Sequence, residues 1–164
     1  MPSDFEVKVE KNYDAAKKLG DSLTPIATGV KTHAANYDNA CNMFYASEDQ
    51  IKELEGKVKS NPKLDGELKK WEGNHPKIAQ RVKTEYAECQ KLRTGVKMAE
   101  KAWDTVSAQH KTLNAGAARA AMTNVNDTKT NLKLTGEMLT KADKEIKRLD
   151  GVLTNCMPYP KTLK

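Results

Sequence analysis

The sequence is poor in aromatic residues and has no long apolar run. Only two phenylalanines and two tryptophans occur in 164 residues, and hydrophobic residues make up 38% of the chain. This composition favours long helices with a thin core, as in coiled coils. Every apolar run falls short of the roughly 18 residues that cross a bilayer, and the opening MPSDFEVKVEKNYD lacks the parts of a signal sequence. These absences predict a soluble, cytoplasmic protein.

The usual motifs of catalysis and metal binding are also missing. The cysteines, Cys41, Cys89 and Cys156, lie far apart without CxxC spacing, so we expect reduced thiols. No HxxxH pair, glycine-rich phosphate loop or nucleophile elbow occurs. The sequence therefore predicts a protein that is not an enzyme, with no catalytic residue, metal or cofactor.

What the sequence does contain is a seven-residue apolar repeat in three successive stretches. Such a seam is the signature of a coiled coil, with the apolar residues at positions a and d of each heptad. The a positions are Val9, Ala16, Leu23, Val30, Tyr37, Phe44, Ile51 and Val58, then Leu68, His75, Val82, Cys89, Val96, Trp103 and His110, then Val125, Leu132, Leu139, Ile146 and Leu153.

The breaks in this repeat set the expected helices. The first seam stops at Ser60-Asn61-Pro62, where Pro suits the first position of a new helix, and the second slips near Asn114-Ala115-Gly116. We predict a single three-helix domain over residues 1–157, with helices at about 4–59, 63–113 and 117–156 and an extended C-terminal tail at 158–164. Because the turns are short, the predicted fold is all-α, an elongated antiparallel three-helix bundle or coiled coil.

Two prolines and several polar residues interrupt the pattern. Pro25 and Pro76 fall inside predicted helices, which we expect to be kinked there, although Gly73-Asn74-His75-Pro76 is equally compatible with a real break. The three histidines, His33, His75 and His110, occupy seam positions, where we expect a polar layer that fixes the register. Glu85 is the one clear charged residue at a seam position.

Lysines gather on the outer positions b and c of the second stretch, where acidic residues are nearly absent. A lysine stripe attracts polyanions, and near an anionic membrane each lysine contributes about 1 kcal/mol. Only four arginines occur and no aromatic residue accompanies the stripe, which argues against nucleic acid. The candidate membrane-binding residues are Lys63, Lys69, Lys70, Lys77, Arg81, Lys83, Lys91, Lys97 and Lys111.

The segment KLDGELKKWEGNHPKIAQRVKTEYAECQKLRTGVKMAEKAW, residues 63–103, resembles the second helix of BAR domains of the amphiphysin type. The features that carry the resemblance are Lys63, Leu64, Asp65, Gly66 and Leu68, followed by Pro76, Ile78 and Arg81. The resemblance implies a non-catalytic, peripheral membrane module, a crescent-shaped homodimer of six helices whose basic surface lies against an anionic phospholipid membrane.

Two other readings stay open. A spectrin-like cytoskeletal or interaction module would present one face to a protein partner, would need no lipid and would be a monomer. An apolipophorin-like helical bundle that opens to carry lipid would need shorter helices, with real breaks at Pro25 and at Gly73 to Pro76.

Overall fold

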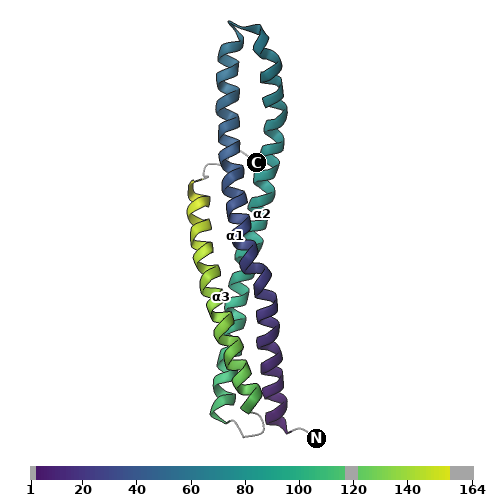
Figure 1. The fold of residues 1–164 in the computed structure, drawn as a ribbon, viewed down its shortest axis with the longest axis vertical. Coiled ribbons are helices and arrows are strands. Elements are labelled where there is room, and N and C mark those ends of the chain that lie inside the picture. Colours follow the sequence, from purple (N-terminus) through teal and green to yellow (C-terminus); the bar gives the residue numbers. More distant parts are fainter. Residues whose placement is uncertain (1–2, 117–121, 156–164) are drawn as a thin grey trace. The chain divides into compact units, whose positions relative to one another are not determined.

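The computed structural model describes residues 3–116 and 122–155, and these are almost entirely helical. Helix α1 spans Asp4–Val58, a short 3-10 helix η1 spans Pro62–Leu64, α2 spans Asp65–Ala115 and α3 spans Met122–Asn155 (Figure 1). The described residues contain no strand, so the predicted all-α class and helical bundle are confirmed. Residue 117, where we predicted that the third helix begins, lies outside the described residues. The predicted tail at 158–164 does so too.

Both internal prolines lie within continuous helices. Pro25 is inside α1, and Pro76 is inside α2. A proline in a helix interior removes one backbone hydrogen bond but does not end the helix where packing on both sides holds it. A break at Gly73 to Pro76 is therefore wrong, and the chain passes through this segment as helix.

The described helices divide into two compact units. Of the described residues, the first unit comprises 3–31, 92–116 and 122–146, and the second comprises 32–91 and 147–155. Because α1 and α2 each continue from one unit into the other, the two units share two of their helices.

The core of the first unit is built from layers to which all three helices contribute. One layer combines Leu19 and Leu23 of α1, Ala99 of α2 and Leu139 of α3, and the half-buried Trp103 packs against it. Further layers contain Val106 with Leu132 and Val9 with Val125. The N-terminal residues of α1 contact the C-terminal residues of α2. The contacts between α1 and α3 advance along both helices in the same direction. The apolar seams thus face one another, as heptad packing requires.

The second unit pairs the later part of α1 with the first part of α2. Tyr37 lies 5.9 Å from Tyr86 and Phe44 lies 4.8 Å from His75, measured between ring centroids. Tyr37 and Val82 are almost completely buried. Aromatic pairs at these separations stabilise a helix contact beyond the area that they bury.

The cysteines differ in state, and one prediction is wrong. Cys89 is a free, buried thiol, as expected, but Cys41 is disulfide-bonded. Cys156 lies outside the described residues. Spacing alone gave no sign of this bond, because a disulfide depends on which segments the fold brings together.

Candidate functional site

The candidate membrane-binding residues are all exposed, but they belong to different units. Lys63 lies in η1, and Lys69, Lys70, Lys77, Arg81, Lys83 and Lys91 lie on the part of α2 that belongs to the second unit. Lys97 and Lys111 lie on the part of α2 in the first unit. The second unit therefore collects seven of the nine in one stretch of chain, residues 63–91.

Helix geometry explains why these side chains avoid the core. Lys70, Lys77 and Lys91 are separated by multiples of seven residues, so they return to the same side of α2. The residues of this stretch that are buried are Leu68, Ala79, Val82 and Cys89. They project from the opposite side at 100° per residue, which leaves the lysines toward solvent.

Two of the seven basic residues are neutralised by neighbours on their own helix. Lys69 pairs with Asp65 at 3.1 Å and Lys91 pairs with Glu88 at 3.4 Å. Such exposed pairs contribute only about 0–1 kcal/mol to stability, yet they cancel local charge. The remaining five make no ion pair with any described residue, and we call them the basic face: Lys63, Lys70, Lys77, Arg81 and Lys83.

Arg81 is the member of the basic face that also contacts α1. Its Nη1 lies 3.8 Å from the Met43 sulfur, so its position is partly fixed by the neighbouring helix. On α1, by contrast, acidic residues are frequent near the end of the helix. Glu53 there pairs with Lys57 at 2.6 Å, and the hydrogen bond from Lys57, followed by its charge, lowers the pKa of Glu53. Lys57 at the end of α1 is thus paired, whereas the five residues of the basic face are not.

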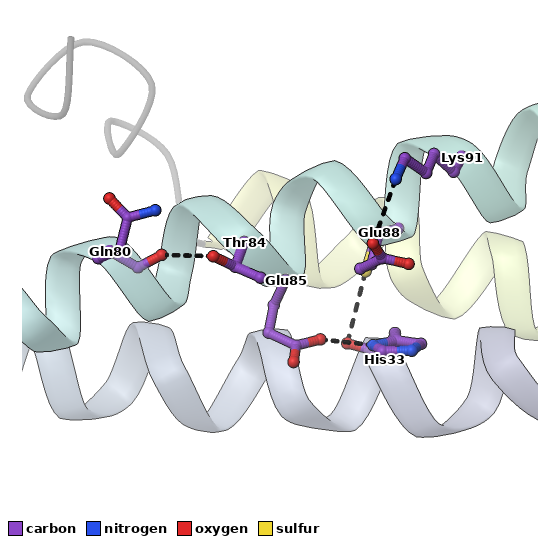
Figure 2. A network of polar contacts seen from close by, with 7 residues as sticks. His33, Gln80, Thr84, Glu85, Glu88 and Lys91 are labelled. Carbon is purple, nitrogen blue, oxygen red and sulfur yellow. Dashed lines mark hydrogen bonds and ion pairs between the residues drawn. The ribbon is translucent and has the colours of Figure 1, made fainter.

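A polar cluster interrupts the seam of the second unit (Figure 2). The Nδ1 atom of His33 lies 2.6 Å from Oε2 of Glu85, and both side chains are mostly buried. The thiol of Cys89 donates to the backbone carbonyl of His33 at 3.4 Å. The cluster thus joins the two helices through one side-chain pair and one bond from a thiol to the backbone.

The other two seam histidines have different surroundings. Nδ1 of His75 lies 2.9 Å from the Ser47 hydroxyl. His110 has a buried Nδ1 without a hydrogen-bond partner in the described structure, and burial, followed by the charge of Lys129, lowers the pKa of His110. The three seam histidines therefore have three different surroundings: a carboxylate, a hydroxyl and no hydrogen-bond partner among the described residues.

The first unit contains a pair of carboxyl groups that could not be predicted from the sequence. Glu100 of α2 lies beside Asp143 of α3, and burial, then the charge of Asp143, raises the pKa of Glu100. These side chains line a cavity of about 240 Å³ together with Trp103. The pair joins positions 43 residues apart, which no short motif reveals.

No grouping of histidine, cysteine and carboxylate residues that could hold a metal ion occurs in residues 3–116 and 122–155. Over the same residues, no helix combines the length and apolar character needed to span a bilayer. No protein family, curated protein or solved structure that was compared with the chain matches it.

Proposed function

We propose that this chain is a non-catalytic module that binds anionic membrane surfaces through the basic face of η1 and α2. The observation that carries the proposal is that Lys63, Lys70, Lys77, Arg81 and Lys83 are exposed and have no acidic partner in the described structure. Structural surface lysines are normally interspersed with carboxylates that they can pair with. A run of cations without partners is suited to an external polyanion.

The energy available is sufficient for reversible binding. Each lysine or arginine held near an anionic leaflet contributes about 1 kcal/mol, so five residues give several kcal/mol. This attraction acts over a Debye length of about 8 Å at physiological salt and weakens as salt increases. Lysine is also a compact point charge that needs no fixed geometry, which fits contact with a fluid array of phosphates.

The resemblance to BAR domains suggests how several weak contacts with the membrane combine into a higher overall affinity. A homodimer would carry two basic faces, and binding both to one membrane raises the overall affinity well above that of one face. The bonded state of Cys41 is unusual for a cytosolic protein, because structural disulfides are typical of oxidising compartments. The proposal requires an anionic leaflet and not a particular side of the membrane.

Vesicle sedimentation tests the proposal. We expect the full chain to bind vesicles that contain about 30% phosphatidylserine at low salt, to bind phosphatidylcholine vesicles weakly, and to dissociate as salt rises. The double substitution Lys70→Glu and Lys77→Glu should reduce the apparent affinity at least tenfold. Lys31→Glu with Lys52→Glu, two exposed lysines on α1, makes the same change in net charge and is the control.

Two results would contradict the proposal. One is equal binding to neutral and anionic vesicles, and the other is an equal loss of binding in the two double variants. Light scattering of the same samples gives the molar mass and shows whether two chains associate.

A spectrin-like interaction module is the second candidate, and the first unit favours it. There, three helices close a core without any further chain, as in the layer of Leu19, Ala99 and Leu139. That reading predicts a monomer without lipid dependence. An apolipophorin-like bundle would need helix breaks at Pro25 and at Gly73 to Pro76. These breaks are not found, because α1 and α2 continue through Pro25 and Pro76.

A further inference from the structure

The first unit contains a cavity that the proposed function does not use. It has a volume of about 380 Å³ and lies between α1 and α2, lined by Lys8, Lys11, Asn12, Gln109, Thr112 and Leu113. Sites for small molecules typically measure about 300–1,000 Å³, so this cavity has the size for one small ligand. It shares no residue with the basic face.

Two lysines at the cavity set the charge of its ligand. Lys8 and Lys11 are three residues apart, which places them on neighbouring turns of one side of α1. Both are exposed and neither forms an ion pair with a described residue. The nearby Glu10 is engaged elsewhere, since its Oε2 accepts a hydrogen bond from Asn124 of α3 at 3.0 Å. The two ammonium groups are therefore available to an anion.

A buried amide also lines the cavity. Asn12 is 4% exposed, and its Nδ2 donates to the backbone carbonyl of Val106 across the helix pair at 3.1 Å. This bond fixes the side chain where a leucine or alanine would complete the seam. Thr112 donates its hydroxyl to the carbonyl of Ala108 at 3.3 Å, which leaves the oxygen lone pairs of Thr112 free to accept. The wall thus combines fixed polar groups with mobile charges.

The rest of the lining is apolar. Leu113 belongs to the cluster of Val9, Val125 and Phe5, so the cavity adjoins the hydrophobic core. The methylene chains of Lys8 and Lys11 add apolar surface beneath their charged ends. A ligand that satisfies both kinds of surface has an anionic head and an apolar body.

We propose that this cavity binds one single-chain anionic amphiphile, with its carboxylate or phosphate head between Lys8 and Lys11 and its chain against Leu113. A free fatty acid and a lysophospholipid share this chemistry. The proposal stands independently of membrane binding, because it involves a monomeric ligand and a different set of residues.

Calorimetric titration of the full chain with decanoate, below its critical micelle concentration and without vesicles, tests the proposal. We expect one decanoate per chain, and Lys8→Glu with Lys11→Glu should raise Kd at least tenfold, which corresponds to about 1.4 kcal/mol. The control is Lys141→Glu with Lys144→Glu, two exposed lysines of α3, which should leave Kd within twofold. Decyl phosphate in place of decanoate shows which head is preferred.

Further arms separate the cavity from general charge attraction. Gln109→Trp places a bulky side chain at an exposed lining position and should abolish binding with both lysines intact. The variant Lys70→Glu with Lys77→Glu should bind decanoate normally. The result for the cavity can therefore be distinguished from the result for membrane binding. The proposal is overturned if decanoate does not bind, if decyltrimethylammonium or acetate binds as tightly, or if the Lys8 and Lys11 variant binds unchanged.

Discussion

Glu85 and His33 each place a polar group in a seam that is mostly apolar, and each supplies a partner for the other. Their 2.6 Å contact joins α1 to α2 within the second unit (Figure 2). A mostly buried carboxylate without such a partner would carry a large desolvation cost. A pair of this kind favours the helix alignment that brings its two members together, so we expect it to contribute to the register.

His110 represents the opposite situation, a seam histidine without an acidic partner. Burial, then Lys129, lowers its pKa below the usual 6.5, so the unfolded chain takes up the proton first as pH falls. A base with a depressed folded-state pKa costs stability as pH falls through the unfolded value toward the folded one. We expect the melting temperature to decrease from pH 7.5 to pH 5.5.

The substitution His110→Gln isolates this contribution. Glutamine does not titrate, so the melting temperature of the variant should fall less over the same pH interval than that of the parent chain. Thermal melts followed by circular dichroism at both pH values measure the difference. Equal pH dependence in the two proteins would show that His110 does not contribute.

At the scale of the helix, two glycines inside helices have opposite environments. A Cβ atom added at Gly73 of α2 would meet nothing within 4 Å, whereas one at Gly136 of α3 would lie 3.2 Å from Cζ2 of Trp103. The Trp103 ring cannot move away easily, because its Nε1 donates to the Leu132 carbonyl at 2.9 Å. The same substitution should therefore have opposite signs at the two sites.

We expect Gly73→Ala to stabilise the chain by about 0.5–1 kcal/mol, the usual gain from replacing glycine in a helix interior. Gly136→Ala should destabilise it by about 1 kcal/mol, since overpacking outweighs the same helix gain. Urea denaturation of both variants measures these changes. Stabilisation of similar size at both positions would mean that Trp103 adjusts freely.

The helices themselves could be predicted from the sequence, because the heptad repeat is local. Seam residues such as Val82 and Val125 are buried as expected, and the observed start of α1 and end of α2 lie within two residues of the predicted ones. The partners of polar seam residues could not be predicted. Glu85 meets His33 and Glu100 meets Asp143 only once separate helices are aligned, and periodicity within one helix carries no information about that alignment.

The candidate site likewise has features that could be predicted from the sequence and features that could not. Exposure of the lysines follows from their b and c positions, and all of them are exposed. Which lysines lack a counter-charge depends on rotamers and on residues three or four positions away, as for Lys69 with Asp65. The cavity beside Lys8 and Lys11 requires two helices to be placed together, so it had no signal in the sequence.

At the scale of the whole molecule, the question is whether the two compact units unfold together. Helices α1 and α2 each pass from one unit into the other without a break. Because helix formation is cooperative along a continuous segment, unfolding in one unit removes the ends on which the other unit builds. We therefore expect one cooperative transition, in contrast to domains that are joined by a flexible linker.

The two tryptophans allow a direct test, since Trp103 lies in the first unit and Trp71 in the second. The substitution Trp103→Phe removes the partly buried hydrogen bond to Leu132 and should cost about 1–3 kcal/mol. In this variant Trp71 is the only tryptophan, and its fluorescence reports on the second unit. If the molecule is cooperative, the urea midpoint measured at Trp71 will also be lowered. It will coincide with the midpoint measured by loss of the helical circular dichroism signal. Trp71→Phe is the reciprocal control, with Trp103 as the reporter. If Trp71 keeps the parental midpoint while the helical signal is lost in two steps, the units unfold independently, and a lesion in the first unit would leave the basic face of the second intact.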